Sequence, residues 1–132
     1  MNLKNSKMST VLIAEDDDDD FFLINRKFHS HYPEAILRRV LNGEELMGYL
    51  RTNELPVMII LDLNMPRVDG REVMKVMKKD EDLKDIPVVV LTTSSSDVDR
   101  KFVSEQGAVF LTKPYKVSSY SDLMELLRQY IE

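Results

Sequence analysis

The chain has 132 residues, 43% of them hydrophobic and 31% charged, a composition typical of one soluble domain with a single core. It contains no cysteine, which excludes disulfides and thiolate metal sites, and its net charge of −5 argues against nucleic-acid binding by the bulk surface. No apolar run has the length of a membrane span, and residues 1–9 lack the apolar core of a signal peptide. We expect residues 1–9 to be a flexible N-terminus and residues 10–132 to form one domain.

Short apolar runs alternate with helical patterns along the chain. The runs, rich in β-branched residues, predict strands at residues 10–14, 35–40, 58–61, 88–91 and 109–111. The run at 35–40 carries Arg38 and Arg39, which indicates an edge strand. Strands that alternate with helices form βαβ units, so the expected fold class is α/β with a parallel sheet.

The first two helices have clear ends. The first follows the strand at 10–14, and Tyr32-Pro33 ends it. The second begins at Asn42, which forms a capping-box variant with Glu45, and runs to about residue 51. The inward face of the first helix carries apolar residues at helical spacing: Phe21, Ile24 and Phe28.

The last three helices follow the same pattern. The third is expected at residues 70–79. Asp97 is the expected cap of the fourth, which ends before Gly107, and Ser121 is the expected cap of the fifth. The inward-facing residues of the third and fifth helices are Val73, Met74, Met77, Leu123, Leu126, Leu127 and Tyr130.

Polar side chains follow four of the strands at the point where each strand ends. Glu15 and Asp16 follow the first strand, Asp62 the third, Thr92 the fourth and Lys113 the fifth. The carboxyl ends of parallel strands form the edge where α/β sheets bind ligands. Three acids, one hydroxyl and one lysine are therefore expected to converge at this edge.

This constellation resembles the receiver domain of two-component response regulators. The resemblance covers nearly the whole chain, from about Thr10 to the end. The matching positions are Asp62 for the phosphoacceptor, Glu15 and Asp16 for the acidic pair, Thr92 for the hydroxyl, Lys113-Pro114 for the Lys-Pro pair and Phe110 for the switch aromatic.

The resemblance implies a flavodoxin-like, doubly wound sheet with strand order 2-1-3-4-5 and five helices. It implies that Asp62 takes a phosphoryl group from a histidine kinase or phosphotransfer protein, with self-catalysed transfer and autodephosphorylation as the only chemistry. The expected partners are that kinase and a downstream protein, with neither nucleic acid nor membrane, and the expected location is the cytoplasm. It also implies a cis Lys113-Pro114 bond.

The clustered acids need a counter-charge, and carboxylate and carbonyl oxygens suit Mg²⁺. By resemblance, Asp16 and Asp62 bind the metal directly, Glu15 acts largely through water, and the backbone carbonyl of Asn64 completes the set. Two positions depart from the family pattern: Glu15 stands where an aspartate is usual, and Thr93 where a small residue is usual. The remaining acids are interpreted as a solvated helix N-terminus favoured by the helix dipole: Asp18, Asp19 and Asp20.

The resemblance makes Thr92 and Phe110 the switch residues and the fourth helix, fifth strand and fifth helix the responding face. This face is a candidate for partner binding or homodimerisation because of its apolar load, although the same side chains could pack under the loops. The chain stops with the fifth helix, so no output domain is expected. The apolar residues of the candidate face are Phe102, Tyr115, Val117 and Tyr120.

Four segments of the chain are similar to single-domain regulators that work with phytochrome-type kinases. They are Glu15-Asp16-Asp17, Asn64-Met65-Pro66, Ile86-Pro87 and the Thr/Ser loop after residue 91.

Three other classes of protein share parts of this pattern. A haloacid-dehalogenase-type phosphatase also forms an aspartyl phosphate, but it needs an acid two positions after the nucleophile, where this chain has Asn64. A flavin binder would need a phosphate loop after the first strand, where residues 15–20 are all acidic. A receiver-like binding module that works without phosphorylation remains open, although the complete residue set favours phosphorylation.

Overall fold

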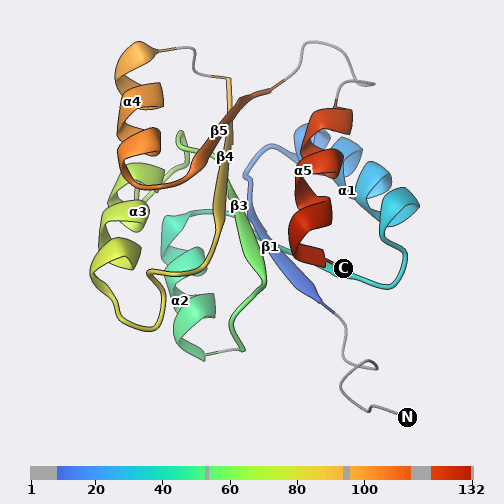
Figure 1. Ribbon diagram of the computed structural model, residues 1–132, viewed down its shortest axis with the longest axis horizontal. Coiled ribbons are helices and arrows are strands. Elements are labelled where there is room, and N and C mark those ends of the chain that lie inside the picture. Colours follow the sequence, from blue (N-terminus) through green and yellow to red (C-terminus); the bar gives the residue numbers. More distant parts are fainter. Residues whose placement is uncertain (1–8, 53, 94–95, 114–119, 132) are drawn as a thin grey trace.

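The computed structural model describes residues 9–52, 54–93, 96–113 and 120–131 (Figure 1). Within them, five parallel strands form one sheet of order β2-β1-β3-β4-β5. The strands are β1 (Thr10–Ala14), β2 (Ile36–Val40), β3 (Met58–Leu61), β4 (Val88–Thr92) and β5 (Val109–Thr112). The order and the alternation with helices confirm the predicted flavodoxin-like α/β fold.

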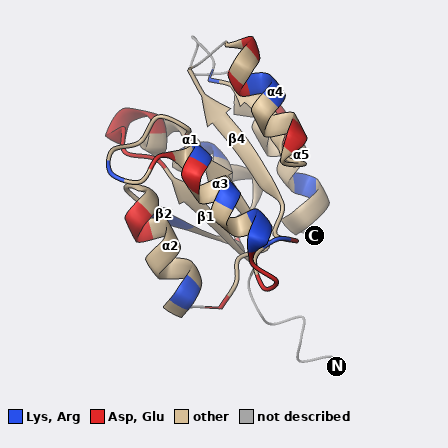
Figure 2. Ribbon diagram, turned by 90° about the vertical axis from the view of Figure 1, so that its left-hand side faces the viewer, with Lys and Arg blue, Asp and Glu red and all other residues tan. Residues whose placement is uncertain are grey.

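The sheet is buried most deeply at its centre. Every residue of β3 is buried, whereas the edge strands β2 and β5 are only partly covered. Figure 2 shows charged residues mainly on helices and loops, and among the strands only β2 carries charge, at Arg38 and Arg39. The predicted edge position of this strand is therefore confirmed.

Helices cover both faces of the sheet (Figure 1). Because successive strand residues point to opposite faces, Leu12 packs with α2, α3 and α4, while Ile13 packs with α1 and α5. The helices are α1 (Asp18–His31), α2 (Gly43–Thr52), α3 (Gly70–Lys79), α4 (Asp97–Glu105) and α5 (Ser121–Ile131). None of the described helices is both long and apolar enough to cross a membrane.

Most predicted boundaries agree with the structure to within one residue. The capping residue of α4 is an exception, since Ser96 rather than Asp97 accepts the hydrogen bond from the backbone N–H of Asp99, at 3.3 Å. Both residue types cap helices well, so the pattern alone could not choose between them. Gly107 lies beyond the end of α4 with φ of 77°, as its predicted role requires.

Of the two positions left open for Tyr120, on an exposed face or packed beneath the loops, the structure shows a buried one. Its side chain is 3% exposed and packs in the cluster between the sheet, α1 and α5. Phe102 is half-buried against the opposite cluster. Tyr115, Val117 and the expected cis bond at Pro114 lie outside the described residues.

Candidate functional site

The carboxyl edge of the sheet brings four of the predicted side chains into the interior. Strand register places the ends of β1 and β3 side by side, since Ala14 pairs with Leu61. Glu15, Asp62, Thr92 and Lys113 are all buried, with residue exposures between 0% and 9%. Burial of this many polar groups at one edge requires that they satisfy one another.

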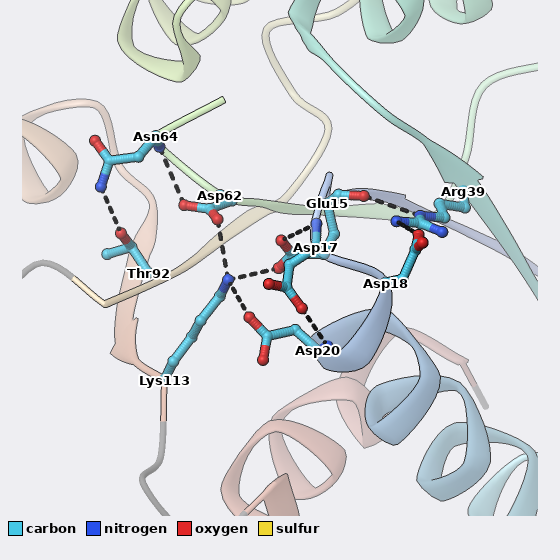
Figure 3. A network of polar contacts seen from close by, with 9 residues as sticks. All are labelled: Glu15, Asp17, Asp18, Asp20, Arg39, Asp62, Asn64, Thr92 and Lys113. Carbon is cyan, nitrogen blue, oxygen red and sulfur yellow. Dashed lines mark hydrogen bonds and ion pairs between the residues drawn. The ribbon is translucent and has the colours of Figure 1, made fainter. Parts of the chain in front are cut away.

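Lys113 is the centre of this network (Figure 3). Its Nζ lies 2.8 Å from Glu15 Oε1, 2.8 Å from Asp20 Oδ2 and 3.0 Å from Asp62 Oδ2. An ammonium has three protons, so three carboxylate oxygens can satisfy it completely. The lysine is held at the centre of the site rather than in solvent.

Asp20 was interpreted from sequence as part of a solvated helix start, and that interpretation was wrong. It lies in the first turn of α1, and this turn carries its carboxylate to Lys113. The partner is 93 residues away along the chain, so only the packing of α1 against the sheet brings the two together. Asp18 is also paired, with Arg39, while Asp19 is exposed as expected.

Asp62 is held on its other side by the loop that follows β3. Its Oδ1 accepts a hydrogen bond from the backbone N–H of Asn64 at 3.1 Å, and the Asn64 side-chain amide donates to Thr92 Oγ1 at 3.4 Å. Figure 3 shows this chain of contacts from Asn64 to Asp62 and from Asp62 to Lys113, with Thr92 below the Asn64 side chain. Both oxygens of the Asp62 carboxylate therefore have fixed partners.

The acids Glu15, Asp16 and Asp62 form a group suited to a cation. One carboxylate oxygen from each lies within 4.8 Å of the others, and Asp16 is exposed while the other two are buried. A set made only of hard oxygen donors, open to solvent on one side, fits an ion of the Mg²⁺ or Mn²⁺ type. The residues present thus meet the chemical requirement for such an ion.

Burial and ion pairing shift the pKa values of two residues in the site. Burial raises the pKa of Glu15 to about 7, and the nearby Lys113 ammonium offsets only part of this effect. Burial acts to lower the pKa of Lys113, but hydrogen bonds from the ammonium to Asp20 and Glu15 outweigh it and raise that pKa above its ordinary value. The lysine is therefore a permanent cation at neutral pH.

Arg39 fixes the loop that carries the acids, a role that the sequence did not indicate. Its Nε donates to the backbone carbonyl of Glu15 at 2.9 Å, and one terminal nitrogen lies 2.9 Å from Asp18 Oδ1. The guanidinium also stacks 4.7 Å from the centre of the Phe21 ring. A planar guanidinium can make these contacts together, and they tie the acidic loop to β2.

A second arginine, Arg71, links the start of α3 to α4 on the other side of the site. Arg71 donates to both oxygens of Asp69, the cap of α3, and to Asp99 Oδ1 on α4 at 2.9 and 2.7 Å. The hydrogen bond to Asp99 is the main cause of a raised Arg71 pKa. Close packing at Gly70 keeps α3 near the backbone of Asp62.

Comparisons with known proteins agree with this geometry. Residues 11–128 match the response regulator receiver domain family. The chain is 36% identical over 126 residues to the probable methanogenesis regulatory protein FilR2 of Methanothrix harundinacea, covering 91% of this chain and 81% of that protein. It is also 52% identical over 52 residues to the response regulator Rcp1 of Synechocystis, covering 39% of this chain and 35% of that protein.

Solved structures are similar over nearly the full chain. The phosphorylated cyanobacterial phytochrome response regulator RcpA has a TM-score of 0.86 at 30% identity, covering 95% of this chain and 94% of RcpA. The Mn²⁺-bound form of Rcp1 has a TM-score of 0.85 at 30% identity, covering 94% of this chain and 95% of Rcp1. The chain belongs to the response regulator receiver domain family.

Proposed function

We propose that this protein accepts a phosphoryl group on Asp62 from a phosphohistidine of a partner kinase or phosphotransfer protein. The observation that carries the proposal is the placement of the Asp62 carboxylate between the Lys113 ammonium, at 3.0 Å, and the acids of the cation group. This arrangement supplies a nucleophile together with the positive charge that phosphoryl transfer needs. The structure of the similar protein RcpA is that of a phosphorylated response regulator, which supports this proposal.

The bond changes are simple. An Asp62 oxygen attacks phosphorus, a P–O bond forms, and the P–N bond to the donor imidazole breaks with its electron pair moving to nitrogen. Lys113 neutralises charge on the transferring oxygens, and the Thr92 hydroxyl donates to one of them. Later attack by water on phosphorus releases phosphate and restores the carboxylate, so the protein itself is the substrate rather than an enzyme with turnover.

Mg²⁺ is the proposed cofactor. Asp16 and Asp62 would hold it directly, Glu15 would act largely through water, and the Asn64 backbone carbonyl would complete the protein ligands. When bound, the ion neutralises charge on the acceptor and on the phosphoryl oxygens. The acid group around Asp62 supports this assignment, as does the Mn²⁺-bound form of the similar protein Rcp1.

Output is proposed to run through Thr92 and Phe110. Contact with the phosphoryl group would draw Thr92 toward Asp62, and Phe110 would turn inward into the space vacated. The changed face of α4, β5 and α5 would then bind a downstream protein or a second copy of the chain. The likeness to RcpA supports a phytochrome-type kinase as donor. We further propose that residues 10–132 act as one cytoplasmic receiver domain; the N-terminal segment before them, apart from residue 9, lies outside the described residues.

The test is intact-mass analysis after incubation with acetyl phosphate and Mg²⁺. The wild-type protein should gain one phosphoryl group, chelation of the metal should prevent the gain, and Asp62→Asn should abolish it because an amide is a poor nucleophile. Asp85→Asn, an exposed acid on the loop before β4, is the matched control and should label normally. Undiminished labelling of Asp62→Asn would contradict the assignment of Asp62 as the phosphoacceptor.

A further inference from the structure

The three partners of Lys113 are not equivalent. Glu15 and Asp62 belong to the group of acids whose oxygens lie within 4.8 Å and can share a cation, and Asp20 does not belong to it. Asp20 also comes from a different element, since it lies on α1 rather than at a strand end. One carboxylate at the ammonium is therefore independent of the cation group.

Asp20 is held in place by its own backbone. Its N–H donates to Oδ1 of Asp17, the cap of α1, at 2.8 Å. In a capping box the side chain at this position would return to the cap N–H. Here the N–H of Asp17 instead donates to Glu15 Oε2 at 3.1 Å, so the Asp20 carboxylate is directed to Lys113.

A bound divalent cation changes the balance around the lysine. It would draw on the same Glu15 and Asp62 carboxylates that hold the ammonium, and its charge would repel Lys113. A phosphoryl group on Asp62 would further replace one of the oxygens that the lysine contacts. Of the three carboxylates that now contact Lys113, Asp20 is then the one that neither the cation nor the phosphoryl group engages.

We propose that Asp20 is a positioning residue that anchors Lys113 beside Asp62 while the cation and the phosphoryl group occupy the site. The inference rests on the proposed function. It assigns to Asp20 no contact with metal or phosphate, and its effect acts through the lysine. An unanchored Lys113 would be pushed toward solvent when the cation binds.

The first test compares phosphorylation and metal binding in Asp20→Asn. At saturating Mg²⁺, phosphorylation by acetyl phosphate should slow by about 10- to 100-fold, because misplacing a reacting or stabilising group by about 1 Å can cost about 100-fold in rate. The Mg²⁺ Kd, measured by calorimetry, should change by no more than about fivefold, as expected for one partly exposed charge. Asp20 is half-exposed in the first helical turn, where asparagine fits without a clash.

Two variants control for charge and for folding. Asp19→Asn removes the same charge from the same turn of α1, where Asp19 is exposed, and should phosphorylate at the wild-type rate. Asp20→Glu keeps the carboxylate and should recover part of the lost rate. It also keeps the proposal testable if Asp20→Asn does not fold.

A second readout does not depend on activity. The ammonium protons of Lys113, followed by ¹⁵N-lysine NMR with Mg²⁺ bound, should stay protected from exchange with water in the wild type and in Asp19→Asn. In Asp20→Asn they should exchange rapidly. Protection that is equal in all three proteins would overturn the anchor role.

The remaining outcomes separate this inference from the proposed function. If the wild type labels at Asp62 and Asp20→Asn labels as fast as Asp19→Asn, the anchor is wrong and the proposed function stands. If Asp20→Asn loses Mg²⁺ affinity in step with its rate, Asp20 is a metal ligand and the anchor is again wrong. If the wild type does not label, or Asp62→Asn still labels, it is the proposed function that fails.

Discussion

The guanidinium of Arg100 on α4 lies 4.6 Å from the centre of the Phe110 ring on β5. Phe110 is half-buried and packs against the cluster between the sheet and α2, α3 and α4. A cation over an aromatic face is stabilised by about 0.5–1 kcal/mol at an exposed site. This contact therefore favours the present ring position over the inward position proposed for the phosphorylated protein.

Removing the contact should make the switch easier to operate. In Arg100→Ala, the phosphate mimic beryllofluoride should bind about two- to fivefold more tightly with Mg²⁺, because the inward state no longer competes with the cation–ring contact. Lys101→Ala removes a neighbouring exposed charge from the same helix and should leave the affinity unchanged. Equal affinities in Arg100→Ala and the wild type would show that this contact does not bias the switch.

Arg39→Lys tests whether the acidic loop is positioned from β2. Lysine keeps the charge but cannot reach the Glu15 carbonyl, Asp18 and the Phe21 ring together. The Mg²⁺ Kd should rise by about tenfold, as is typical when a group that orients metal ligands is lost. Arg38→Lys, on the exposed side of the same strand, is the control, and a matching change in both variants would contradict the role of Arg39.

Gly70→Ala should destabilise the protein at the start of α3. A Cβ there would lie 2.9 Å from the carbonyl oxygen of Asp62 and 2.9 Å from Leu63 Cα, both backbone atoms that cannot move aside cheaply. We expect a loss of about 1–3 kcal/mol in urea unfolding. Gly48→Ala, in α2 with open space around it, should instead gain up to about 1 kcal/mol. Equal effects at the two glycines would contradict the close approach.

Glu15 should make the metal-free protein less stable as pH rises. Its folded pKa of about 7 lies above the ordinary value of 4.5, so between these values the folded state binds more protons than the unfolded state. The contribution of Glu15 to the free energy of unfolding is fully present below about pH 4.5 and is lost as pH rises through about 7. It amounts to about 3 kcal/mol. Glu15→Gln should lack it, as urea titrations from pH 5 to 8 would show. Parallel curves for the two proteins would rule out a raised Glu15 pKa.

Strand ends were the part of the site that the sequence could predict. Glu15, Asp62, Thr92 and Lys113 each follow an apolar run directly, and in a parallel sheet that position alone determines which edge they occupy. The fold was predictable for the same reason, since buried parallel strands read as continuous apolar runs. The strand order came from the family resemblance and not from the pattern.

Contacts that depend on how the helices pack could not be predicted from the sequence. Asp20 stands among acids that any helix start would favour, and no local signal distinguishes it from Asp19. The sequence could not decide whether Tyr120 is exposed or buried, because its burial depends on the packing of α5 with α1. The ring contacts of Arg39 and Arg100 join separate elements, so no local pattern in the sequence indicated them.

The most direct test of the account is to locate the phosphoryl group itself. After reaction with acetyl phosphate and Mg²⁺, borohydride reduction converts an aspartyl phosphate to homoserine, which peptide mass mapping can place in the chain. The account predicts homoserine at position 62 and at no other acid of the site. The account would be contradicted by homoserine at Asp16, Asp17 or Asp20. It would also be contradicted if no homoserine formed in a protein that binds Mg²⁺.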